Sequence, residues 1–104
     1  MQRVASLIHL NAARSLKLTG KGVGIAVFDT GIGRHPDLTM PGTRLQAFVD
    51  IVNHRKDYYD DNGHGTHITG IIAGSGQASQ RKYEGIAPDS HFIMIKVLNQ
   101  KGEG

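Results

Sequence analysis

The stretch Gly22–Ile32, GVGIAVFDTGI, holds a nearly continuous apolar run from Val23 to Phe28. The run is rich in β-branched residues and is bounded by glycines, a pattern typical of a strand buried on both faces of a parallel sheet. Asp29 follows directly, where the run meets a glycine turn. Ligands and catalytic groups gather at the carboxyl ends of parallel strands, so this stretch predicts an α/β fold and a candidate site together.

Comparable patterns along the rest of the chain predict the other elements. Apolar runs indicate two more strands, apolar residues three and four positions apart indicate two helices, and Gly- and Pro-rich segments indicate loops. The order strand, strand, helix, strand favours a layered α/β sheet, with the second helix crossing one face of it. The expected strands are Leu45–Val52 and His91–Leu98, the helices are Val4–Leu16 and His64–Ala73, and the loops are Gly31–Gly42 and Gly74–Gly85.

The composition fits one small globular domain covering residues 1–104. Of the 104 residues, 38% are hydrophobic and 20% are charged, and none is cysteine. A disulfide framework, a thiolate nucleophile and a zinc–thiolate site are therefore excluded. A core of this size is modest, so any catalytic site must be built from few elements.

The charge pattern argues against two classes of partner. The pI is near 9.5, but the 12 Lys and Arg residues are interleaved with 9 Asp and Glu residues. Such scattered charge does not favour nucleic-acid binding. No apolar stretch approaches the roughly 18–20 residues that cross a bilayer, and the first residues lack the apolar region typical of a signal peptide. We therefore expect a soluble chain that binds neither nucleic acid nor membrane.

Local features leave the role of Asp29 open. A carboxylate at this position can orient an imidazole, act as a general base or bind a metal ion. It can equally cap the turn through the backbone amides of Thr30 and Gly31, because Asp commonly bonds the backbone two residues on. The residues alone favour neither interpretation.

His64 opens the second predicted helix, so its imidazole is expected to project into the cleft beyond the sheet, where it can titrate near neutrality. His67 lies three residues on, on the same helical face, which raises a metal-binding His-x-x-His pair as an alternative. No Glu follows His64 as in zinc proteases of the H-E-x-x-H type, so no metal site is favoured. The remaining histidines show no mutual spacing, and the acidic residues before His64 fit a solvated turn; these residues are His9, His35, His54, His91, Asp57, Asp60 and Asp61.

Four stretches resemble, in order, the signatures of the subtilisin-like serine proteases, or subtilases. They are Gly22–Ile32, His35–Leu38 (HPDL), Asn62–Ala73 (NGHGTHITGIIA) and Gly85–Pro88 (GIAP). The resemblance covers residues 18–104, and its histidine motif is long enough to be highly specific. It implies the subtilisin-like α/β fold, a three-layer parallel sheet with helices on both faces, of which residues 1–104 represent only the N-terminal part.

The resemblance implies a serine endopeptidase with a Ser-His-Asp triad. In it, Asp29 is the triad aspartate, His64 is the general base and His67 is a packing residue. The nucleophile motif of the family lies beyond Gly104, so the 104-residue chain alone is expected to be inactive and to need the remainder of the domain as its partner. The serines present lack the flanking residues of that motif and are read as surface or loop residues: Ser6, Ser15, Ser75, Ser79 and Ser90.

By the same resemblance, the substrate is an extended peptide or unfolded protein. The family uses a Gly-x-Gly segment after the third strand as an edge strand for the substrate backbone, and Gly102, Glu103 and Gly104 match it by position. Asn62 would line the pocket beside the histidine. The side-chain preference is left open, because the pockets that select side chains lie mostly outside this stretch.

No cofactor is required by the implied mechanism, but many subtilases bind calcium. They do so through an aspartate matching Asp37 and a loop after the histidine helix. Here the loop Gly74–Glu84 lacks the paired asparagines of that site, while hard cations need six or more oxygen ligands. The alternative is that Asp37 caps the turn after Pro36.

Three further interpretations follow from the residues. The stretch Val27–Gly31 also matches the Asp-Thr-Gly signature of dimeric aspartic proteases, in which two copies of Asp29 would share a proton, although that fold is nearly all β. A catalytically inactive fragment or interaction module of the subtilase fold is the second. A dinucleotide site is set aside, because its glycines must follow a strand rather than precede one. For localisation, the family favours an extracellular protein, but intracellular members exist.

Overall fold

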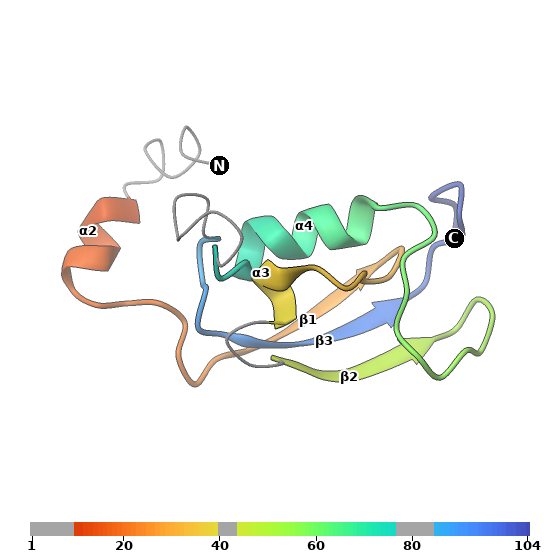
Figure 1. Ribbon diagram of the computed structural model, residues 1–104, viewed down its shortest axis with the longest axis horizontal. Helices are drawn as coiled ribbons and strands as arrows, with labels where there is room; N and C mark the ends of the chain where they lie inside the picture. Colours follow the sequence, from red (N-terminus) through yellow and green to blue (C-terminus); the bar gives the residue numbers. More distant parts are fainter. Residues whose placement is uncertain (1–9, 40–43, 77–84) are drawn as a thin grey trace.

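The computed structural model describes residues 10–39, 44–76 and 85–104, in which helices and strands alternate along the chain (Figure 1). This alternation is what parallel strands require, because each must be joined to the next by a crossover. The elements are α2 (Leu10–Ser15), β1 (Gly24–Asp29), α3 (Pro36–Thr39), β2 (Leu45–Asp50), α4 (His64–Ala73) and β3 (His91–Lys96).

The strands form one parallel sheet in the order β1-β3-β2. β3 is central and is hydrogen-bonded to β1 on one side and to β2 on the other. The register places Asp29, Lys96 and Asp50 side by side, at the carboxyl ends of the three strands. The prediction of a parallel α/β sheet is confirmed, and polar side chains are brought together at one edge.

One face of the sheet is covered by α4, which lies above the strands in Figure 1. The helix turns small residues spaced four apart toward the sheet, and Gly65, Thr69 and Ala73 are buried. Small side chains let the helix backbone approach the strands closely. The buried core between the layers consists of Val27, Ile32, Leu38, Ala73, Phe92 and Met94.

The opposite face of the sheet is open, which corrects the expectation that the first strand is buried on both faces. Along β1, Val27 and Asp29 are buried, but Phe28 between them is 63% exposed. Val49 of β2 and Ile93 of β3 are exposed on the same side. No helix covers this face within residues 10–39, 44–76 and 85–104 (Figure 1), so a sequence patterned for two-sided burial shows one-sided burial here.

The element ends differ from the predicted ones for local reasons. β2 stops at Asp50 rather than Val52, because the Asp50 carboxylate accepts hydrogen bonds from the amides of Val52 and Asn53 and turns the chain. β3 stops at Lys96, two residues before the predicted end. The predicted loop Gly31–Gly42 contains the helical turn α3, which the prolines and glycines of the sequence concealed.

The first helix matches its prediction only in part. Residues 4–9 lie outside the described residues, and α2 ends at Ser15. Leu16 was expected on the apolar face but is 72% exposed, and Lys17 follows with a left-handed φ of 60° that stops the helix. Arg14 of α2 donates to the carbonyls of Gly85 and Ile86. In the described part of the chain, no helix combines the length and apolarity needed to span a membrane.

Candidate active site

Asp29 and His64 meet where β1 ends and α4 begins. The Nδ1 atom of His64 lies 2.9 Å from Oδ1 and 3.1 Å from Oδ2 of Asp29. Asp29 is buried, with 8% of its surface exposed, whereas the His64 side chain is 58% exposed. A buried carboxylate therefore holds an imidazole whose far side faces outward.

The protonation pattern of this pair follows from hydrogen-bond chemistry. An ionised carboxylate can only accept, so the neutral imidazole must carry its proton on Nδ1 and leave Nε2 as an acceptor. Asp29 Oδ1 also accepts the Thr30 amide at 2.7 Å. Both interpretations left open for Asp29 are thus partly met, since it bonds the turn that follows it and orients an imidazole. In this arrangement His64 can accept a proton from a group placed beside Nε2.

Glycines allow the two elements to come this close. A Cβ on Gly65, the second residue of α4, would lie 2.2 Å from the carbonyl oxygen of Gly31, so only glycine fits this contact. A Cβ on Gly31 would lie 2.1 Å from the Tyr59 carbonyl oxygen. Gly63, the residue before α4, has a left-handed φ of 101°. The glycines of both sequence motifs therefore set the distance between β1 and His64.

Thr30 and Asp60 tie the same elements together. The Thr30 hydroxyl donates to Asp60 Oδ1 at 2.9 Å and accepts the amide of Gly65 at 2.8 Å. Asp60 also accepts hydrogen bonds from Thr66, Gly63 and Asn62. Burial acts to raise the pKa of Asp60, but these hydrogen bonds outweigh it and lower the pKa to about 2. Asp60, expected in a solvated turn, instead fixes the start of the helix that carries His64.

A second carboxylate shapes the loop between β2 and α4. Asp50 accepts the hydroxyl of Tyr59 and the amides of Val52, Asn53 and Arg55. Burial raises the pKa of Asp50, but the hydrogen bonds lower it more strongly, to about 2. Burial, with the bond to Asp50, raises the pKa of Tyr59. The loop between β2 and α4, which leads to His64, is therefore anchored to the end of β2.

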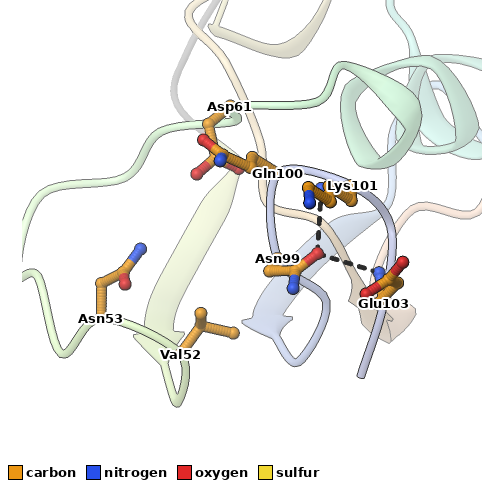
Figure 2. Close-up of a pocket in the computed structure, with 7 residues that line it drawn as sticks. All are labelled: Val52, Asn53, Asp61, Asn99, Gln100, Lys101 and Glu103. Atoms are coloured by element: carbon orange, nitrogen blue, oxygen red, sulfur yellow. Dashed lines mark hydrogen bonds between the residues drawn. The ribbon is translucent and has the colours of Figure 1, made fainter.

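Asn62 joins this loop to the segment after β3. Its side-chain amide donates to the Gln100 carbonyl at 2.9 Å, and its side-chain oxygen accepts the His64 amide at 3.1 Å. Beside this contact lies a polar cavity of about 420 Å³ (Figure 2). Asn62 is not among the residues that line this cavity, so its expected place in a substrate pocket stays a prediction; it does connect His64 to the segment that contains the other predicted substrate-binding residues. The cavity is lined by Val52, Asn53, Asp61, Asn99, Gln100, Lys101 and Glu103.

Gly102, Glu103 and Gly104 do not form the expected strand. Figure 2 shows Asn99 bonded to both Lys101 and Glu103, which closes a turn. The Gly102 amide donates to the Asn99 carbonyl, and the Glu103 carbonyl accepts the Asn99 amide. Because these backbone groups are used within the turn, they are not presented as a strand edge. Pairing of this segment with a substrate stays a prediction that requires the turn to open.

His67 is exposed on α4, which corrects its expected packing role. It points away from the sheet because the buried side of α4 is formed by Gly65, Thr69 and Ala73. Within the described segments no group of three or more His, Cys, Asp or Glu residues could hold a metal ion. Among the serines, Ser75 and Ser90 are buried loop residues rather than surface ones, and Ser6 and Ser79 lie outside the described residues.

Asp37 lies in α3, where its backbone carbonyl accepts the Ser75 amide at 2.6 Å and an Arg44 guanidinium N–H at 2.9 Å. Its backbone amide donates to the ring nitrogen of His35 at 3.1 Å. Residues 77–84 of the loop expected to complete a calcium site lie outside the described residues. These contacts involve the backbone of Asp37, and calcium binding by its side chain stays a prediction.

Sequence reasoning missed the residues that hold the pair in place. The sequence pattern predicts only a turn amide for Thr30 and a solvated turn for Asp60, and it assigns no role to Lys96. Lys96 carried a signal, because it is the one charged residue within the apolar run from Phe92 to Leu98. A charge in a buried strand needs partners, and the structure provides them at this end of the sheet.

Comparison with known proteins gives a consistent result. The family model described as the subtilase family, peptidase S8, matches residues 20–104. Serine protease AprX of Bacillus subtilis (strain 168) is 53% identical over 87 residues, covering 84% of this chain and 19% of that protein. Minor extracellular protease Epr of the same organism is 40% identical over 99 residues, or 93% of this chain and 14% of Epr.

Subtilisin Savinase of Lederbergia lenta is 38% identical over 95% of this chain and 34% of its own length. A crystal structure of a cold adapted subtilisin-like serine proteinase superposes with a TM-score of 0.68 and 34% identity, covering 84% of this chain and 29% of that one. The chain thus spans about a third or less of these relatives. Its parallel sheet and its Asp29–His64 contact also disagree with the nearly all-β aspartic proteases. The chain belongs to the subtilase family.

Proposed function

We propose that the complete protein carrying this chain is a serine endopeptidase that hydrolyses peptide bonds. Asp29 orients His64, and His64 acts as the general base for a serine supplied from outside residues 1–104. The observation that carries the proposal is the 2.9 Å contact between His64 Nδ1 and the buried Asp29 carboxylate, with the imidazole otherwise exposed. Because this contact uses Nδ1, the Nε2 atom of His64 stays available to the proposed serine nucleophile.

The proposed reaction proceeds in two halves. His64 Nε2 takes the serine proton as the hydroxyl attacks the scissile carbonyl, and Asp29 stabilises the imidazolium that forms. The imidazolium then gives its proton to the leaving amine, and an acyl-enzyme remains. In the second half His64 takes a proton from a water molecule as the water attacks the acyl carbonyl, and it returns this proton to the serine oxygen as the ester bond breaks. Since His64 makes every proton transfer, this chemistry needs no cofactor.

We propose an extended peptide or unfolded protein as the substrate, in keeping with the protease names of the relatives. Asn62 supports this proposal because it connects His64 to the segment that ends in Gly102, Glu103 and Gly104. An extended substrate lying along that segment would reach the exposed side of His64. The remainder of the catalytic domain, with the serine, is the proposed partner of residues 1–104.

An extracellular location is part of the proposal, and its support is the name of one relative, minor extracellular protease Epr. Calcium is proposed to be dispensable for the reaction. Any calcium bound at Asp37 would serve the stability of the fold rather than the chemical step. Chelation with EDTA should then change thermal stability and leave the rate of peptide hydrolysis by the folded protein unchanged.

The proposal is tested on the complete protein from its natural source, beginning with its intact mass and the sequence that follows Gly104. The expected result is hydrolysis of an unstructured peptide that a serine-directed phosphonate blocks with one label per molecule. Inhibition by pepstatin instead would favour the dimeric aspartic protease. A protein that neither hydrolyses the peptide nor reacts with the phosphonate would be an inactive module of the fold.

A further inference from the structure

Lys96 is the most deeply buried charged residue among those that the structure describes, with 0% of its surface exposed. It is the last residue of the central strand β3, between Asp29 of β1 and Asp50 of β2 in the register. A buried cation is costly unless its donors are satisfied, and similar volume could be filled by an apolar side chain at no loss of stability. The surroundings of this ammonium group therefore indicate what it does.

Three acceptors surround the Lys96 ammonium, matching its three N–H donors. It donates to the Thr30 carbonyl at 2.6 Å, to the Leu98 carbonyl at 2.7 Å and to Asp61 Oδ1 at 2.8 Å. The ring of Tyr59 lies against it, with its centroid 5.2 Å from the nitrogen. The cation is fully partnered, and each partner comes from a different part of the chain.

Each of the three acceptors belongs to a segment of the proposed active site. Thr30 follows Asp29, Asp61 lies three residues before His64, and Leu98 leads into the turn that ends at Gly104. One ammonium group thus links the segment of the aspartate, the segment of the histidine and the segment proposed to contact the substrate.

The end of β3 holds the backbone next to Asp29 directly. The Asp29 carbonyl accepts the amides of Val97 and Leu98 at 3.0 and 3.2 Å, and the next carbonyl, that of Thr30, accepts the Lys96 ammonium. The carbonyls of two successive peptides, Asp29–Thr30 and Thr30–Gly31, are therefore held by residues at the end of β3. The Asp29–Thr30 peptide also supplies the Thr30 amide that holds Asp29 Oδ1, so its orientation sets the direction in which the carboxylate faces His64.

We propose that Lys96 is a positioning residue for the reaction. It acts through Thr30, Asp61 and Leu98 to hold the Asp29 carboxylate in line with His64 and to fix both relative to the turn 99–104. The inference rests on the proposed serine protease function. A residue of this kind affects the rate strongly, because a displacement of about 1 Å in catalytic geometry can cost on the order of 100-fold.

The test compares Lys96→Met with Lys21→Met in the complete protein; Lys21 is exposed and lies before β1. Active sites are counted by the end point of phosphonate labelling, and kcat is expressed per labelled site. We expect Lys96→Met to lower kcat by about 10–100-fold, and Lys21→Met to leave it unchanged. A lysine that only stabilises the fold would lower the number of labelled sites and the unfolding temperature, with kcat per site unaltered; that result overturns the proposal.

Two further variants keep the test decisive. Lys96→Arg retains the charge and donors, so partial recovery of kcat relative to Lys96→Met is expected. If Lys96→Met does not fold, Asp61→Ala removes one partner of the ammonium from the exposed side, where the Asp61 side chain is 32% exposed. A fall in kcat per site of about threefold or more supports the proposal, and no change overturns it.

A readout without catalysis separates this inference from the proposed function. The proton on His64 Nδ1, bonded to Asp29, gives a low-field proton resonance that His64→Ala identifies. We expect Lys96→Met to shift or abolish this resonance and Lys21→Met to keep it, even if the protein hydrolyses no peptide. An unchanged resonance in folded Lys96→Met overturns the positioning role, while the absence of hydrolysis and labelling in the unmodified protein overturns the proposed function alone.

Discussion

Asp60 Oδ2 accepts two hydrogen bonds from Thr66, one from the backbone amide at 2.8 Å and one from the side-chain hydroxyl at 2.6 Å. The residue directly before α4, Gly63, has no side chain with which to cap the helix. Asp60 therefore caps α4 from three residues further upstream, where it also receives the Gly63 amide. The first turn of the helix, with His64 in it, depends on this carboxylate.

Asp60→Ala should destabilise the complete protein by about 1–2 kcal/mol at neutral pH, the range found for lost helix caps and lost hydrogen bonds to charged groups. The measurement is chemical unfolding of the variant and the unmodified protein. Asp57→Ala is the matched control, because Asp57 is exposed in the same loop. It should change stability by less than about 0.5 kcal/mol. Equal effects of the two substitutions would contradict the capping role of Asp60.

The contribution of Asp60 should depend on pH. Its pKa is about 2 in the folded protein and near 3.8 when unfolded, so the folded state binds its proton less readily. The stabilisation is therefore fully present above about pH 5 and is lost as pH falls toward 2. The difference in unfolding free energy between the unmodified protein and Asp60→Ala should narrow over that interval. A difference that stays constant down to pH 2 would show that the charge of Asp60 contributes nothing.

His64→Ala should reduce kcat/KM for peptide hydrolysis by at least about 10²–10⁴-fold, the usual contribution of a general base. His67→Ala is a matched control on the same helix, since His67 is exposed and takes no part in the contact with Asp29. It should retain the activity of the unmodified protein. If His67→Ala lost activity and His64→Ala did not, His67 rather than His64 would be the general base.

Asp29→Asn should keep the shape of the site but lower kcat by about 10⁴-fold, the loss seen when the triad carboxylate is replaced by an amide. The amide can donate a hydrogen bond to His64 Nδ1, which would leave the ring proton on Nε2 and remove the base. The measurement is kcat as a function of pH. Activity that stays high in the Asp29→Asn variant at neutral pH would assign Asp29 to the turn alone.

The contact between Asp29 and His64 and the parallel sheet could be predicted because both are encoded in short contiguous stretches. The run from Val23 to Phe28 predicts a strand and the pattern from His64 to Ala73 predicts a helix. Asp29 ends this strand, and His64 begins this helix. Parallel strands then bring Asp29 and His64 to one edge of the sheet. The same reasoning could not reveal how far Phe28 is exposed, because covering a face depends on elements elsewhere in the chain.

The support of the pair could not be predicted, because it is built from contacts between residues far apart in sequence. Lys96 reaches Thr30 across 66 positions. The Thr30 hydroxyl reaches Asp60 across 30. Neither spacing follows a helical or strand period, so no pattern in the sequence predicts these two contacts. The turn at Asn99 was missed for a different reason: Gly-x-Gly fits an edge strand and a turn equally well, and the Asn99 side chain decides between them.

Gly65→Ala should destabilise the complete protein by about 1–3 kcal/mol, the usual cost of overpacking, and should lower activity as well. Its added methyl group would lie 2.2 Å from the Gly31 carbonyl oxygen, so α4 must move away from β1 and carry His64 with it. Gly70→Ala is the control on the same helix. Nothing lies within 4 Å of a Cβ there, so helix propensity should make that variant more stable by up to about 1 kcal/mol. Opposite signs for two identical substitutions, measured by chemical unfolding, would establish that the contact between Gly65 and Gly31 sets the position of His64; a neutral Gly65→Ala would refute it.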